Sequence, residues 1–119
     1  MTIEELYQKL GGDFAKVCTR LPGRRFVERF VERYLSDDSA EQLLAALQEG
    51  DAEESYRLAL ALKGVAGNLG FEDLEEDAAC LVQILRAGTV TPEALRQGEL
   101  VKRRHQTAVK AIRLYQSEK

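Results

Sequence analysis

Residues 55–70 read SYRLALALKGVAGNLG and decide the fold, because they hold the longest apolar helical run in the chain. At about 100° per residue, one face of a helix collects four apolar residues, Leu58, Leu62, Val65 and Leu69. A stripe with this spacing is typical of a helix that packs its apolar side into a protein core. We therefore expect residues 55–70 to form a central, partly buried helix.

The opposite face of this helix carries an unusual set of residues. Leu60 lies roughly 160° from the apolar stripe, on the side that should face solvent. The same side carries Tyr56, Lys63, Gly64 and Gly67. A glycine inside a helix costs about 1 kcal/mol relative to alanine, but the missing Cβ lets another surface approach the backbone. That surface is either a partner protein or a neighbouring helix of the same chain, and periodicity favours neither.

Five residues of this stretch match the pattern H-x-L-K-G-x-x-x-x-L-G of histidine-containing phosphotransfer (Hpt) domains, so the chain resembles that family. They are Leu62, Lys63, Gly64, Leu69 and Gly70. Members of the family are small four-helix bundles that relay a phosphoryl group between response-regulator receiver domains. The total length is similar to that of one such domain. The apolar residues that follow, Leu74, Ala78 and Leu81, resemble those of the next helix in the family.

The chain departs from the family pattern at the position that carries the chemistry. The phosphorylated histidine would lie three residues before Lys63, where this chain has Leu60. Phosphoryl transfer to a protein needs an attacking lone pair, which an alkyl side chain lacks. The resemblance therefore implies a degenerate Hpt domain that is not an enzyme and has no catalytic residue. Its expected partner is a receiver domain or a histidine kinase, and the chain is expected to carry no phosphate. The residues expected to bind this partner are Tyr56, Leu60, Lys63, Gly64 and Gly67.

Two other functions stay open on the sequence. An active phosphocarrier would have to use His105, the only histidine. Its helical stripe also holds Val101, Ala108, Ile112 and Tyr115, which favours a packed imidazole over an exposed nucleophile. The third function is a helical bundle that dimerises or supports another protein, although we expect a monomer.

The composition is that of one soluble globular domain. The chain has 119 residues, of which 45% are hydrophobic and 31% charged. It has no apolar run of 18 residues and no secretory leader at the N-terminus, so we expect a cytoplasmic protein without a membrane segment. With 17 basic and 20 acidic residues, the net charge of −3 argues against nucleic acid as the main partner.

No residue pattern indicates a metal or a cofactor. Cys18 and Cys80 lack C-x-x-C spacing and a histidine partner, and we expect both to be reduced and partly buried. The acidic clusters at 51–54 and 72–77 are explained by helix N-termini, where carboxylates complement the partial positive charge. We interpret the basic run at 102–104 as a solvated face.

Amphipathic segments joined by short turns predict an all-α, antiparallel up-and-down four-helix bundle. Residues 1–119 are expected to form a single Hpt-like domain. Its N-terminal lid of short helices occupies residues 1–21, beginning with a capping box at Thr2 and Glu5, and its bundle occupies residues 24–116. Within the bundle we expect a helix at 24–35 that resumes after an interruption at 36–39, the central helix, a helix at 72–87, and a last helix bent at Gly98.

Overall fold

The computed structural model describes residues 1–118, and every regular element in that range is an α-helix. The helices are α1 (Ile3–Lys9), α2 (Phe14–Arg20), α3 (Arg24–Tyr34), α4 (Ser39–Glu49), α5 (Ala52–Leu69), α6 (Glu72–Leu85) and α7 (Pro92–Ser117). The predicted all-α fold is confirmed. None of the helices in residues 1–118 combines the length and the apolar composition that a membrane span requires.

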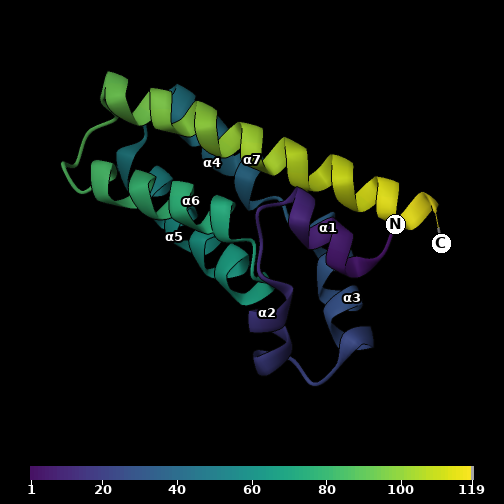
Figure 1. Ribbon diagram of the computed structural model, residues 1–119. Helices are drawn as coiled ribbons and strands as arrows, with labels where there is room; N and C mark the ends of the chain where they lie inside the picture. Colours follow the sequence, from purple (N-terminus) through teal and green to yellow (C-terminus); the bar gives the residue numbers. More distant parts are fainter. Residues whose placement is uncertain (119) are drawn as a thin grey trace.

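Helices α4 to α7 form the four-helix bundle (Figure 1). α5 packs between α4 and α6, and α7 packs between α6 and α4. α5 therefore lies diagonally across the bundle from α7, and its outer side faces away from α7. This arrangement leaves one side of the predicted central helix free for contact with other molecules.

The three N-terminal helices pack together at one end of this bundle (Figure 1). α3, which we expected as part of the bundle itself, contacts α2, α5 and α7. The Tyr115 hydroxyl of α7 donates a hydrogen bond of 3.0 Å to the Glu28 carboxylate of α3. α3 thus supports the C-terminal half of α7, and the predicted interruption separates α3 from α4.

The helix ends follow the capping chemistry of the sequence. Three side chains, those of Thr2, Asp51 and Thr91, accept hydrogen bonds from backbone N–H groups in the first turns of α1, α5 and α7. Gly50 and Gly70 end α4 and α5 with φ angles of +73° and +70°. This left-handed conformation suits glycine, so the turn into α6 is set locally.

The glycine inside α7 has a different role from the one we expected. α7 is a single helix from Pro92 to Ser117, and Gly98 is buried within it. A Cβ at Gly98 would lie 2.7 Å from Cδ1 of Leu47 in α4. The glycine therefore permits close packing of α4 on α7, a role that the prediction of a bend did not include.

Both cysteines are exposed free thiols, so the prediction of partial burial is wrong. Cys18 follows the buried Val17 in α2, and Cys80 precedes the buried Leu81 in α6. Neighbouring residues of a helix point about 100° apart, which directs both thiols away from the core.

Candidate functional site

The outer side of α5 presents an accessible surface around Leu60. The Leu60 side chain is 41% exposed, as the helical periodicity predicts. Lys63 and Gly64 are exposed beside it, and Tyr56 is half-buried one turn earlier. We refer to Tyr56, Leu60, Lys63 and Gly64 as the Leu60 face. It is an apolar patch of one leucine and one aromatic ring next to a cation.

Lys63 and Gly64 keep this face open. Apart from its two chain neighbours and the backbone of its own helix, no atom lies within 4 Å of the position that a Cβ on Gly64 would occupy. The Lys63 ammonium forms no hydrogen bond or ion pair with any of residues 1–118. An approaching molecule therefore meets bare helix backbone and an unpaired positive charge.

Gly67 does not belong to the Leu60 face, which corrects the sequence prediction. It is buried, and a Cβ there would lie 2.5 Å from Oε2 of Glu75 in α6. Its carbonyl oxygen accepts a hydrogen bond of 2.7 Å from Nη1 of Arg20 in α2. Leu60 and Gly67 point in nearly the same direction, but Gly67 lies two turns further along α5, where α2 and α6 cover it. Gly64 therefore leaves space for another molecule, whereas Gly67 leaves space for Glu75 of α6.

Charged residues border the Leu60 face at the start of α5. A shallow hollow there is lined by Tyr56 and Leu60 together with charged side chains from the first turns of the helix. Among these, the Arg57 guanidinium pairs with the Glu54 carboxylate. The centre of the surface is apolar and its edge is polar, which is the usual anatomy of a protein interface.

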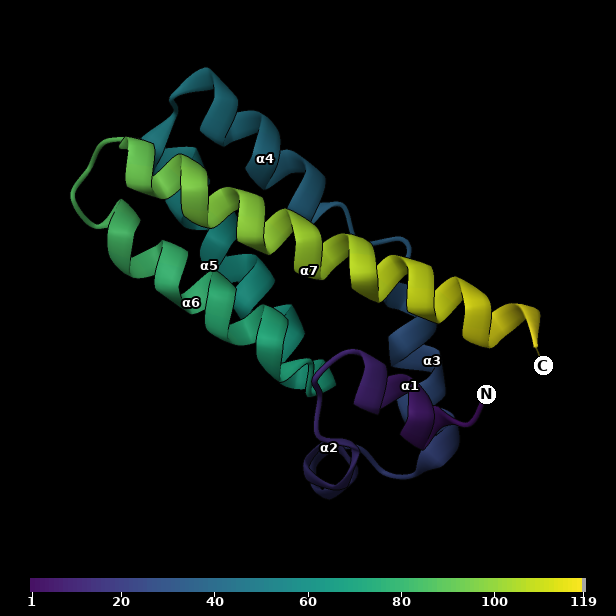
Figure 2. The same cartoon turned by 45° about the horizontal axis from the view of Figure 1, so that its top comes forward.

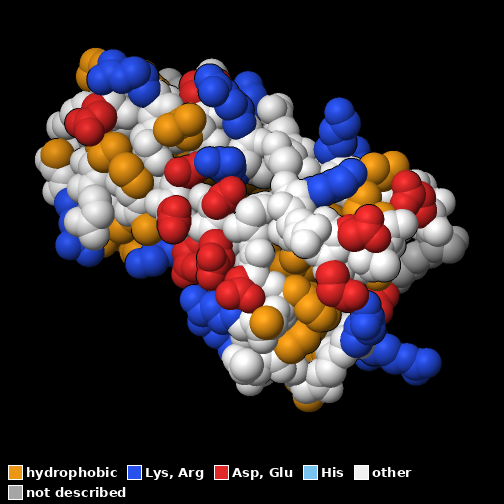
Figure 3. Space-filling model, viewed as in Figure 1, with side chains coloured by type: hydrophobic (Ala, Val, Ile, Leu, Met, Phe, Trp, Pro, Cys, Tyr) orange, Lys and Arg blue, Asp and Glu red, His pale blue; other side chains and the backbone are white. Residues whose placement is uncertain are grey.

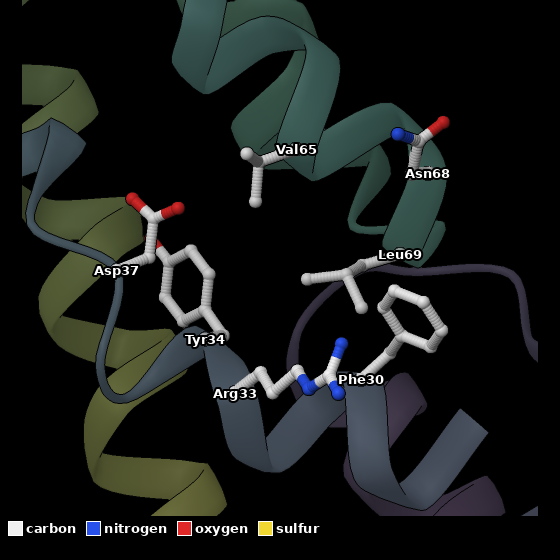
Figure 4. A pocket seen from close by; sticks show the side chains of 7 residues that line it. All are labelled: Phe30, Arg33, Tyr34, Asp37, Val65, Asn68 and Leu69. Atoms are coloured by element: carbon white, nitrogen blue, oxygen red, sulfur yellow. The ribbon is translucent and has the colours of Figure 1, made fainter. Parts of the chain in front are cut away.

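A separate pocket of about 220 Å³ opens between α3 and α5 (Figure 4). Its lining residues are Phe30, Arg33, Tyr34, Asp37, Val65, Asn68 and Leu69. Asn68 is exposed and lies one turn after Gly64 on α5, so the pocket adjoins the side of the helix next to the Leu60 face. Sequence reasoning missed this pocket, because its two walls, residues 30–37 and 65–69, are far apart in the chain.

His105 is buried between three helices. Its Nδ1 lies 2.6 Å from the hydroxyl of Tyr34 in α3, and its Nε2 lies 3.1 Å from Oε1 of Glu41 in α4. Its side of α7 packs into the core, as the apolar stripe predicts. Burial also raises the pKa of Tyr34 well above its ordinary value, so this hydroxyl stays protonated. Both ring nitrogens of the only histidine are thus engaged by neighbouring side chains.

The acidic residues of α6 stabilise its N-terminus and hold α7. Asp and Glu side chains gather near the start of this helix (Figure 3). Arg104 of α7 pairs with two of them, at 3.5 Å from Asp73 and 2.9 Å from Asp77. Arg104 therefore fastens α7 to α6, which the interpretation of residues 102–104 as a solvated face did not include. Over the described part of the chain, no group of three or more His, Cys, Asp or Glu side chains is placed to hold a metal ion.

The searches of curated proteins and of solved structures find no match. The family model of the Hpt domain matches residues 26–113, a range that includes the whole bundle up to the last turn of α7. Since this match covers well over half of the chain, the chain belongs to the Hpt domain family.

Proposed function

We propose that this chain is a degenerate Hpt domain that binds a receiver domain or a histidine kinase through the Leu60 face and carries no phosphoryl group itself. Hpt domains act in phosphorelay signalling, where they interact with receiver domains and kinases. The single observation that carries the proposal is an exposed leucine at the position where the family pattern has its histidine. An alkyl group there supplies contact area and no nucleophile.

The surroundings of Leu60 support docking. The open backbone at Gly64 allows a partner to approach α5 closely. The unpaired ammonium of Lys63 complements the aspartate, or the aspartyl phosphate, of a receiver domain. In this proposal the chain occupies a partner's docking surface, either sequestering the partner or competing with an active phosphotransfer domain.

The environment of His105 argues against the alternative of an active phosphocarrier. A phosphoryl donor needs in-line access to an imidazole lone pair. Here the Tyr34 hydroxyl contacts one ring nitrogen and the Glu41 carboxylate contacts the other. Phosphorylation would require both contacts to open and a buried ring to reach the surface.

The test is a titration of purified receiver domains, in unphosphorylated and phosphorylated form, and of purified histidine kinases, with the wild-type chain and with Leu60→Asp. We expect at least one receiver to bind the wild type and the variant to bind roughly tenfold or more weakly, because a carboxylate would enter the apolar centre of the interface. Leu100→Asp is the matched control, since Leu100 is also 41% exposed but lies on α7. Equal binding by Leu60→Asp, or no binding to any receiver or kinase, would show the proposal to be wrong.

The remaining alternative, a bundle that only dimerises, is tested separately by light scattering across a concentration series. The proposed function expects the mass of a monomer at all concentrations. A mass that doubles in the wild type and not in Leu60→Asp would mean that the Leu60 face binds a second copy of the chain instead.

A further inference from the structure

A groove runs between α4 and α7, on a different side of the bundle from the Leu60 face. Figure 2 shows these two helices next to each other along the first half of α7. Two hollows of about 380 and 510 Å³ lie between them, and both are lined by Leu44 and Lys102. Because they share these residues, the two hollows are adjacent, and we refer to them together as the α4–α7 groove.

The floor of the groove is apolar. Leu95 is 45% exposed in it, and Leu44 and Val109 are half-buried. Leu47 is buried beside them, with its Cδ1 2.7 Å from the position that a Cβ on Gly98 would occupy. Exposed hydrocarbon along a concave strip favours a partner that covers it with apolar side chains.

The walls of the groove are basic. Four cationic side chains line it, those of Arg96, Lys102, Lys110 and Arg113. None of the four forms an ion pair with a residue in the described range, whereas Arg104 on the other side of α7 pairs with two aspartates. Two carboxylates also line the groove, and one of them, that of Glu41, is already in contact with His105. In a chain of net charge −3, this strip carries four cationic side chains against two carboxylates, so its local charge is positive.

We propose that the α4–α7 groove binds an acidic amphipathic helix of a partner protein. Its lining residues on α7 extend from Leu95 to Arg113, a length of about 27 Å at 1.5 Å per residue, whereas its lining residues on α4 extend only from Glu41 to Gln48. A helix of about 18 residues would match this length, with its apolar stripe on Leu44, Leu95 and Val109 and its carboxylates towards the basic walls. Nucleic acid would satisfy the walls but would leave the apolar floor without a partner, so the observations favour a helix.

The direct test uses two synthetic 18-residue helical peptides with the same leucine stripe. One carries glutamates at its other positions and the second carries lysines. We expect the glutamate peptide to bind roughly tenfold or more tightly, to shift amide resonances of α4 and α7 in a ¹⁵N-labelled chain, and to weaken with added salt. Equal affinity for both peptides, shifts on the Leu60 face, no binding, or tighter binding of a single-stranded oligonucleotide would each overturn the proposal.

Variants locate the site and separate it from the proposed function. Lys110→Glu combined with Arg113→Glu should weaken glutamate-peptide binding roughly tenfold, because two attractive pairs become repulsive. Leu95→Gln should also weaken glutamate-peptide binding, because it removes an apolar contact in the floor of the groove. This variant changes no charge, so it can be measured even if the charge variant fails to fold. Leu60→Asp should bind the peptide like the wild type, so receiver docking and groove binding can fail independently. Unchanged affinity in both groove variants would overturn the assignment.

Discussion

The hydroxyl of Tyr34 lies 2.6 Å from Nδ1 of His105, which joins α3 to α7 through the only histidine of the chain. Glu41 of α4 contacts the second ring nitrogen, so three helices meet at this side chain. A histidine held in this way stabilises packing and is withdrawn from solvent. His105 therefore does not lie on the outer side of α5, where the family pattern has its histidine and this chain has Leu60.

Restoring that nucleophile should restore phosphate acceptance. We expect Leu60→His to take up an acid-labile phosphoryl group from a phosphorylated receiver, because Gly64 leaves access to the new imidazole and Lys63 supplies a nearby cation. The wild type should remain unlabelled. The measurement is incubation with a radiolabelled phosphoreceiver.

The control for this experiment is His105→Ala in the Leu60→His background, which should label as well as the single variant. Labelling of the wild-type chain would contradict the proposed function. Absence of labelling in Leu60→His would mean that the surface no longer positions a receiver for in-line transfer.

The same glycine-to-alanine change should have opposite effects at two helical positions. Gly64→Ala should raise the free energy of unfolding by about 0.5–1 kcal/mol, because the new methyl group meets no atom and alanine favours the helix. Gly98→Ala should lower it by about 1 kcal/mol, because its Cβ would lie 2.7 Å from Leu47. Urea unfolding measures both values.

Gly64→Ala also tests docking apart from stability. If close approach to the α5 backbone matters, this more stable variant should bind a receiver more weakly than the wild type. A variant that is both more stable and equally tight in binding would show that the partner does not use the space above Gly64.

Replacing Ser55 with alanine should stabilise the folded protein. Its hydroxyl is fully buried in α5 and has no hydrogen-bond partner among the described residues. An unsatisfied buried hydroxyl costs about 1–3 kcal/mol, so Ser55→Ala should raise the free energy of unfolding by about 1 kcal/mol. The exposed Ser117, whose hydroxyl donates to the Leu114 carbonyl, serves as a control, and Ser117→Ala should change stability by less than about 0.5 kcal/mol. A loss of stability in Ser55→Ala would contradict the expectation.

Two buried tyrosines should make the protein sensitive to alkali. Burial raises the pKa of Tyr7 and of Tyr34 above the ordinary value of 10.0. In the unfolded chain these phenols lose their protons near that value, so above it the folded state binds more protons than the unfolded state. Their contribution to stability is complete below the unfolded pKa and falls as the pH rises beyond it.

The check is the urea midpoint as a function of pH from about 8 to 11, around the ordinary tyrosine pKa. The wild type should lose stability towards the alkaline end, and Tyr7→Phe combined with Tyr34→Phe should reduce this slope. The double variant should also be less stable near neutrality, since the Leu69 carbonyl and Nδ1 of His105 each lose a hydrogen-bonding partner. An unchanged alkaline slope would contradict the assignment.

The sequence by itself determined the features that depend on neighbours in the chain. The apolar stripe of α5, the exposure of Leu60 and the packed side of His105 follow from the 3.6-residue period. The helix ends at Asp51, Gly50 and Gly70 follow from capping groups only a few residues away. Such interactions are local, so residue type and spacing are enough to predict them.

Only the tertiary structure decided which distant residues meet. Gly67 shares the direction of Leu60 along α5, yet Glu75 and Arg20 cover it because α6 and α2 cross there. The partners of His105 come from α3 and α4, and the α4–α7 groove exists only because those two helices pack side by side. These contacts join residues that are 8 to more than 60 positions apart, and the helical period carries no information on how separate helices are placed.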